Sequence, residues 1–84
     1  MIITNDGDSF PCKWAGVATI DGILRFEVEM PSLLDAVLTF GDSSKTAVIV
    51  YQMDETFSER FEGYTELVSV SKNGANFVIA LKEE

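Results

Sequence analysis

The chain has 84 residues, of which 46% are hydrophobic and 11% aromatic. A chain of this length supports one hydrophobic core, so we expect a single domain spanning residues 1–84. Its apolar content excludes a disordered tail, because such segments bury too little apolar surface to offset chain entropy.

Charge and cysteine content narrow the possible functions. Fourteen acidic and six basic residues give a net charge of −8, and the chain has no histidine and one cysteine. Nucleic-acid backbones are bound by clustered Lys and Arg, so we expect no direct nucleic-acid binding. A single cysteine forms no intrachain disulfide, so the fold must depend on packing, or on packing and an oligomeric partner.

The N-terminus gives no sign of a secretory signal, because Met1–Asp6 lacks a basic start followed by a long apolar stretch. The longest apolar run, residues 47–51, is far shorter than the roughly 20 residues that cross a bilayer. We therefore expect a soluble protein with no membrane contact. Its expected location is cytoplasmic, or the virion if the chain derives from a phage.

Turn residues separate runs rich in Val, Ile, Thr, Phe and Tyr, a pattern typical of an antiparallel sheet folded on itself. We expect a mainly β domain of seven or eight short strands, arranged as a small barrel or a sandwich. Three hairpins are predicted, and they pair 1–4 with 9–13, 14–20 with 23–30, and 65–71 with 76–82. The second should have a tight two-residue turn at Asp21-Gly22.

Side-chain alternation predicts which faces are covered. In the strand 23–30 the apolar residues Leu24, Phe26, Val28 and Met30 should face the core, while Arg25, Glu27 and Glu29 should face water. Phe77, Ile79 and Leu81 should likewise share one face. Residues 46–52 are apolar on both faces and so predict a central strand. Trp14 is expected in the core, and Gly16 should mark a bulge or a bend.

A short helix is predicted over residues 32–40. Pro31 interrupts the strand ladder, and Ser32 with Asp35 three positions later forms a capping pattern. The apolar residues Leu33, Ala36, Val37 and Phe40 fall on one helical face, which Leu34 and Leu38 widen. We expect this helix to cover one side of the sheet.

The densest charge lies between residues 54 and 66, where five acidic residues accompany only Arg60. Residues 53–64 fit a strand better than a short helix. Acidic and aromatic side chains together are suited to dock a basic partner, although we favour the alternative of a half-exposed strand with its aromatics in the core. The candidate partner surface comprises Asp54, Glu55, Phe57, Glu59, Glu62, Tyr64 and Glu66.

Catalytic and cofactor motifs are missing. Without histidine, the remaining nucleophiles and bases are carboxylates, Lys, Tyr and Cys12, and a buried, inert cysteine fits Cys12 well. The segment Asn5–Ser9 resembles part of a calcium loop but lacks its distant acidic ligand. No nucleotide-binding glycine motif is present. We therefore expect that the protein is not an enzyme and that it binds no cofactor and no metal.

The segments Phe61–Leu67 and Phe77–Lys82, with the early Asn5-Asp6-Gly7, resemble small uncharacterised proteins encoded among the tail genes of phages and prophages. That resemblance implies a virion or assembly accessory that acts through protein contacts.

Three functional classes follow from these patterns. The first is a non-enzymatic structural or protein-interaction module, which we expect to form a homo-oligomer or to bind another protein. The second is an acidic inhibitor that mimics nucleic acid and occupies a basic enzyme. The third is a small ligand-binding β-barrel, since a curled sheet can enclose a cavity.

Overall fold

The computed structural model describes residues 1–5 and 7–83, and it contains a seven-stranded sheet and one helix. The expectation of a mainly antiparallel β fold with one short helix is confirmed. The elements are β1 (Ile2–Asn5), β2 (Asp8–Val17), β3 (Leu24–Glu29), α1 (Leu33–Phe40), β4 (Val48–Gln52), β5 (Ser58–Glu62), β6 (Glu66–Asn73) and β7 (Asn76–Lys82).

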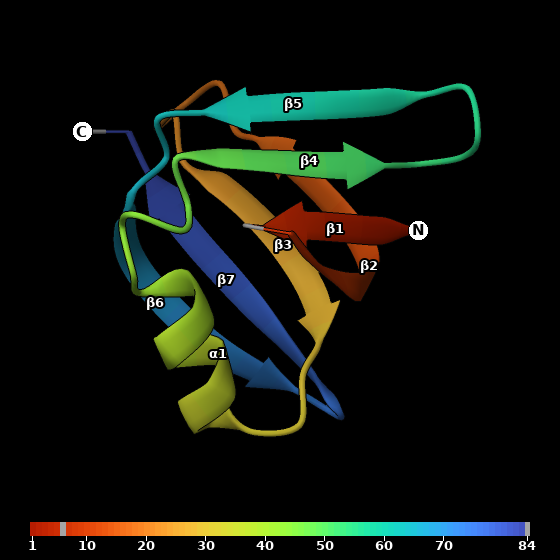
Figure 1. Cartoon of the computed structure of the whole chain (residues 1–84). Helices are drawn as coiled ribbons and strands as arrows, with labels where there is room; N and C mark the ends of the chain where they lie inside the picture. The colour runs from red at the N-terminus through yellow and green to blue at the C-terminus, as the bar shows by residue number, and fades with distance from the viewer. Residues whose placement is uncertain (6, 84) are drawn as a thin grey trace.

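The strands lie in the order β5-β4-β1-β2-β3-β7-β6, and every neighbouring pair is antiparallel. The sheet bends across its middle, so that β4 and β5 cross the direction of β3 and β7 (Figure 1). Buried side chains from both halves meet in the core, including Ile3 and Ile49 from one half and Phe26 and Ile79 from the other. The edge strands are β5 and β6.

The long strand β2 joins the two halves of the sheet. We expected separate strands over 9–13 and 14–20, but β2 continues to Val17. The bulge also lies elsewhere than predicted, because the register with β3 shifts between Cys12 and Trp14 and not at Gly16. An extra residue in one strand increases the local twist, and here it allows one strand to serve both halves.

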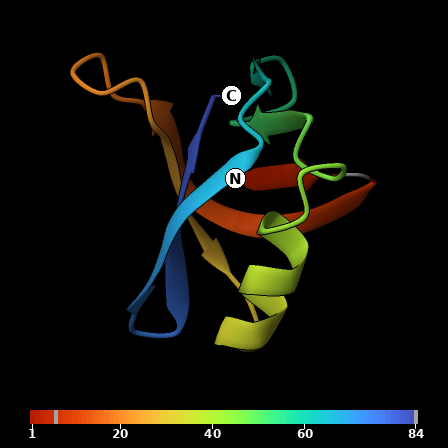
Figure 2. The same ribbon diagram turned by 90° about the vertical axis from the view of Figure 1, so that its left-hand side faces the viewer.

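The connection between β2 and β3 is longer than the predicted two-residue turn. It spans residues 18–23, and Figure 2 shows it projecting from the body of the sheet. The N–H of Gly22 donates to the carbonyl of Ala18 (2.8 Å), and the N–H of Ile23 donates to Oδ1 of Asp21 (3.0 Å). These bonds stabilise a wider loop, in which Gly22 takes its expected positive φ of 67°.

The remaining hairpins agree with the sequence patterns. Asn5 pairs with Asp8 in the first hairpin, whose residue Asp6 lies outside the described part of the chain. Asn73 pairs with Asn76 in the last, around a turn at Gly74 with φ 64°. The predicted strand over residues 53–64 is confirmed as the shorter β5.

Two strand placements differ from expectation. Residues 48–52 form β4, which lies next to the edge strand, while β2 occupies the centre. Only Ile49 and Tyr51 of β4 are buried, because the side chains of its other face have no second layer over them. The buried apolar faces of β3 and β7 are as predicted.

Trp14 and Glu27 each have the opposite solvent exposure to that predicted. Trp14 is 41% exposed on the outer face of the sheet, whereas Glu27 opposite it is only 4% exposed. The outer face of β2, β3 and β7 is therefore partly covered by its own long side chains, which the alternation of apolar and charged residues did not reveal.

Candidate interaction surface

A side-chain cap begins α1. The backbone N–H of Asp35 donates to Oγ of Ser32 (3.2 Å), and the Ser32 hydroxyl donates to Oδ2 of Asp35 (2.9 Å). This cap pairs a backbone donor that the first helical turn leaves free. The predicted helix and its cap are confirmed, and the cap fixes where the helix begins.

Only one narrow stripe of α1 packs against the sheet. Ala36 and Phe40 are fully buried, and the ring of Phe40 lies edge-on to Phe26, with 5.0 Å between centroids. Leu33 and Val37, which we expected on this covered face, are 53% and 40% exposed. A single helix resting on a sheet covers residues four positions apart, so its flanking positions remain open to solvent.

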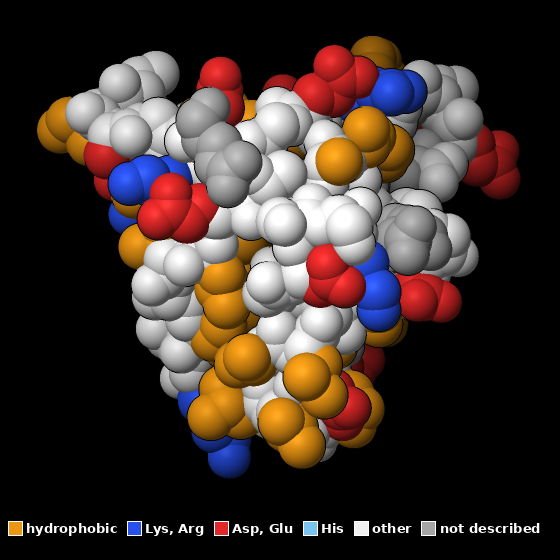
Figure 3. All heavy atoms as spheres, turned by 60° about the vertical axis from the view of Figure 1, so that its left-hand side comes forward, with side chains coloured by type: hydrophobic (Ala, Val, Ile, Leu, Met, Phe, Trp, Pro, Cys, Tyr) orange, Lys and Arg blue, Asp and Glu red, His pale blue; other side chains and the backbone are white. Residues whose placement is uncertain are grey.

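The outward side of α1 is apolar. Leu33, Leu34, Val37 and Leu38 are neighbours on the helix surface and are 40–66% exposed. We call these four residues the α1 outer face. Figure 3 shows hydrophobic side chains gathered at this end of the molecule. Contiguous apolar patches on soluble proteins mark interaction sites more often than isolated exposed side chains do.

A groove of about 670 Å³ opens beside the N-terminal end of α1, between the β3–α1 connection and the β6–β7 turn. Met30, Leu33 and Phe77 contribute apolar surface to it, and Glu29 and Lys72 are its charged lining residues. Leu33 belongs both to this groove and to the α1 outer face. The two features therefore form one continuous surface.

The predicted acidic surface begins in the loop between β4 and β5. Oδ1 of Asp54 accepts hydrogen bonds from the N–H groups of Thr56 (2.7 Å) and Phe57 (2.8 Å), and these bonds hold the pKa of Asp54 below its ordinary value. Glu55 is exposed, and Phe57 is 65% exposed. Asp54 thus stabilises the loop, while Glu55 and Phe57 are open to solvent.

The other members of that surface are divided among elements. Arg60 forms an ion pair with Glu62 (2.6 Å) on β5, and Glu66 at the start of β6 lies 3.7 Å from Lys82. Glu59 is exposed opposite Tyr51 on β4. The structure therefore brings Asp54, Glu55 and Phe57 together but separates them from Glu66.

The aromatic side chains of this segment have different environments. Phe61 is buried in the core, and half-buried Tyr64 packs against it edge-on at 6.3 Å between ring centroids. Phe57 alone of the three offers a largely exposed ring. Whether this segment binds a partner stays a prediction.

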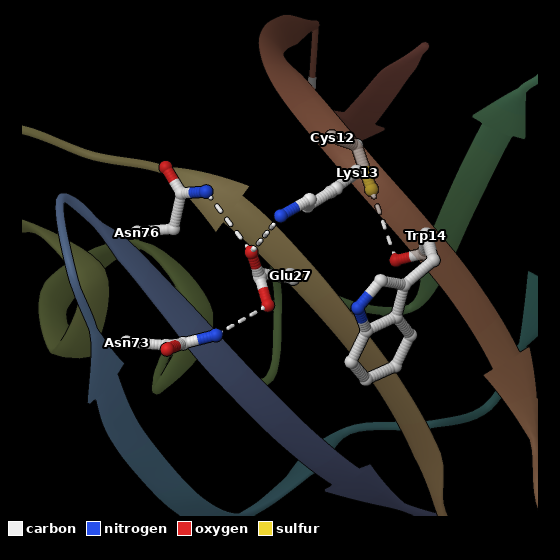
Figure 4. Close-up of polar contacts among 6 residues, drawn as sticks. All are labelled: Cys12, Lys13, Trp14, Glu27, Asn73 and Asn76. Carbon is white, nitrogen blue, oxygen red and sulfur yellow. Dashed lines mark hydrogen bonds and ion pairs between the residues drawn. The ribbon is translucent and has the colours of Figure 1, made fainter.

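A buried carboxylate is the centre of a side-chain polar cluster on the outer face of the sheet (Figure 4). Oε1 of Glu27 accepts from Nδ2 of Asn73 (2.9 Å), and Oε2 accepts from Nδ2 of Asn76 (3.0 Å) and lies 3.8 Å from Nζ of Lys13. The bonds from Asn76 and Asn73 lower the pKa of Glu27. Both oxygens are paired, so this carboxylate holds the β6–β7 turn in place.

The thiol of Cys12 and the phenol of Tyr51 are shielded from solvent. Cys12 is buried and donates its thiol hydrogen to the carbonyl of Trp14 (3.2 Å), and burial raises its pKa to about 11. Burial also raises the pKa of Tyr51. Among residues 1–5 and 7–83, no three His, Cys, Asp or Glu side chains are grouped as metal ligands would be.

Sequence reasoning missed the α1 outer face and the Glu27 cluster. The signal for the first was present, because α1 is apolar at six of its eight positions, more than one packed stripe can use. No local sequence pattern indicated the Glu27 cluster.

No protein-family model, curated protein or solved structure matches the chain. In the described part of the chain, no helix has the length and apolar character needed to span a bilayer.

Proposed function

We propose that this protein is a non-enzymatic protein-interaction module that associates with a second copy of itself through the α1 outer face. The supporting observation is the exposure of four large apolar side chains, Leu33, Leu34, Val37 and Leu38, side by side on one helix. Covering each of them gains roughly 25 cal/mol per Å² of apolar surface removed from water.

The charge distribution restricts how a second copy can bind. A net charge of −8 on each copy opposes association, so the contact must keep acidic regions apart. The acidic loop between β4 and β5 lies at the opposite end of the molecule from α1 (Figure 1). Two copies that meet through α1 hold their acidic loops at far ends.

The edge strands are poorer contact sites. A register shift lies between Leu67 and Ser69 on β6, and β5 has only five residues, four of them exposed and polar. Bulges, short length and charge are the features by which sheets avoid edge-to-edge pairing. Self-association through α1 is therefore favoured over pairing at the sheet edges.

The resemblance to phage and prophage tail-gene products supports a role as a virion or assembly accessory. Self-association of a small accessory without catalytic chemistry suits that role. We propose the absence of enzymatic activity on the same basis.

Sedimentation across micromolar to millimolar concentrations tests the proposal. An α-helix of eight residues is only about 12 Å long, so we expect a small interface and a dimer that dissociates on dilution. Leu34→Asp or Leu38→Asp should give a monomer throughout. Ile20→Asp is the matched control, because Ile20 is 95% exposed on the β2–β3 connection, away from α1.

Salt dependence separates self-association from capture of a basic protein. Screening weakens repulsion between two acidic copies, so added salt should strengthen the dimer, whereas it would weaken binding to a cationic partner. A wild-type chain that is monomeric at every concentration and salt level would overturn the proposal. A dimer that survives Leu34→Asp and Leu38→Asp would exclude the α1 outer face.

A further inference from the structure

We propose that Asn73 is a site of spontaneous deamidation and that Glu27 controls its rate. In this reaction the side-chain amide of Asn73 reacts with the main-chain nitrogen of Gly74, and water then converts the product to aspartate or isoaspartate. The inference concerns the polar cluster of Glu27 at the β6–β7 turn. It does not depend on self-association through α1.

The residue after Asn73 leaves the Asn73 side chain open to attack by the main chain. Gly74 has no Cβ, and no heavy atom beyond its chain neighbours lies within 4 Å of the position that a Cβ would take. Its φ of 64° belongs to a region that glycine adopts without strain. Asn73 and Gly74 are both exposed, so water reaches the turn. The turn therefore supplies what deamidation needs, an unhindered main-chain nitrogen and water.

The reaction balances with water as its only co-reactant. The main-chain nitrogen of Gly74 loses its proton and attacks Cγ of Asn73, and the new C–N bond closes a succinimide ring. The bond from Cγ to Nδ2 breaks, and Nδ2 takes up a proton and leaves as ammonia. One water molecule then opens the ring. Opening at the bond to Cγ gives aspartate, and opening at the bond to the main-chain carbonyl carbon gives isoaspartate.

The Glu27 carboxylate holds the Asn73 side chain away from this reaction. Nδ2 of Asn73 donates to Oε1 of Glu27 at 2.9 Å, and Figure 4 shows the amide pointing toward that carboxylate. Ring closure requires the amide to turn back toward Gly74, so this hydrogen bond must break first. Hydrogen bonds to a charged acceptor are stronger than neutral ones. The turn therefore reacts from a locally opened state, whose population Glu27 limits.

Either product disrupts the polar cluster that protects the turn. The amide donor at residue 73 is replaced by a carboxylate, which faces Glu27 and repels it. Nζ of Lys13 lies 3.8 Å from Glu27, but this lysine is 70% exposed and compensates weakly. Isoaspartate also adds one carbon atom to the main chain, which displaces the pairing of residue 73 with Asn76. Deamidation is thus a one-way switch that releases the end of the β6–β7 hairpin.

Long incubation of the full chain at mildly alkaline pH tests the proposal. Trypsin cleaves after lysine, so one peptide, residues 73–82, carries both Asn73 and Asn76. Mass spectrometry of this peptide detects the gain in mass when NH₂ is replaced by OH, and fragmentation assigns it to a residue. We expect modification of Asn73 in the wild type, and about tenfold faster modification in Glu27→Ala, as loss of a hydrogen bond to a charged group predicts. Asn76 should stay intact in both, because the side chain of Phe77 hinders the nitrogen that follows it.

Two control variants separate local opening of the turn from a general loss of stability. Glu29→Ala removes an exposed carboxylate from the same strand as Glu27. Ile49→Val weakens the core at β4, in the other half of the sheet. Both variants should deamidate Asn73 at the wild-type rate.

Each part of the inference has an outcome that would overturn it. Equal rates in the wild type and Glu27→Ala, or an equal acceleration by Ile49→Val, would exclude control by Glu27. An Asn73 that stays intact even in the chain unfolded by urea would exclude the site. Asn73→Asp, which builds one product directly, should lower the urea midpoint of unfolding further than Asn73→Ala, which removes only the donor. Equal midpoints for these two variants would show that the product does not disrupt the cluster by repulsion.

Discussion

Oε2 of Glu27 accepts a hydrogen bond from Nδ2 of Asn76 at 3.0 Å, across 49 residues of sequence. Asn73 donates to the other oxygen of the same carboxylate, and the two asparagines face each other beside the β6–β7 turn. One buried side chain on β3 thereby fixes the turn between two other strands. Its removal should loosen that hairpin.

Glu27→Gln should lower the urea midpoint of unfolding. Both oxygens of Glu27 accept a hydrogen bond from an asparagine side chain, and glutamine replaces one of these oxygens by an NH₂ group, which is a donor. Either Asn73 or Asn76 therefore loses its buried acceptor. Glu29→Gln is the matched control, because Glu29 is exposed on the same strand. Equal midpoints for both variants would show that the Glu27 cluster contributes nothing to stability.

The Glu27 cluster should also make stability depend on pH. Hydrogen bonds from Asn76 and Asn73 lower the pKa of Glu27 in the folded protein, so its stabilising contribution is present above the ordinary glutamate pKa. That contribution is lost as the pH falls through the lowered pKa. We expect the stability gap between wild type and Glu27→Gln, measured by urea unfolding, to shrink between pH 7 and about pH 3. A gap independent of pH would contradict this assignment.

Phe40→Ala should destabilise the fold by about 3–5 kcal/mol, because it removes a fully buried ring from the contact between α1 and the sheet. Phe57→Ala makes the same chemical change at a ring that is 65% exposed, and it should alter stability by less than about 0.5 kcal/mol. Urea unfolding followed by tryptophan fluorescence measures both. A similar cost for the two variants would mean that Phe57 is covered in solution.

Gly74→Ala should cost about 1–2 kcal/mol, because Gly74 has a φ of 64° that an L side chain adopts only with strain. Gly16 lies in β2 without positive φ and has open space where a Cβ would stand. Gly16→Ala should therefore be neutral or stabilising by up to about 1 kcal/mol. Thermal unfolding distinguishes the two, and a tolerated Gly74→Ala would be inconsistent with this turn.

The thiol of Cys12 should be unreactive in the folded protein. It is buried, and its pKa of about 11 leaves little thiolate near pH 8. We expect a disulfide reagent such as Ellman's reagent to label it only after denaturation. Rapid labelling of the native protein would point to an opening at β2.

Local chemistry explains which features the sequence predicted. The helix begins where Ser32 caps it, and the last hairpin turns where Gly74 supplies a positive φ. The apolar alternation of β3 identifies its buried face. Each of these depends on residues within a few positions of one another, so the sequence pattern carries the signal.

The sequence by itself therefore determined the strand-rich composition, the helix and its cap, and the absence of histidine. Only the tertiary structure decided that the α1 outer face stays uncovered and that Glu27 is enclosed by asparagines from a distant hairpin. The reason is that exposure is set by the elements that pack over a side chain. Those elements come from sequence positions far away, and no local periodicity records them.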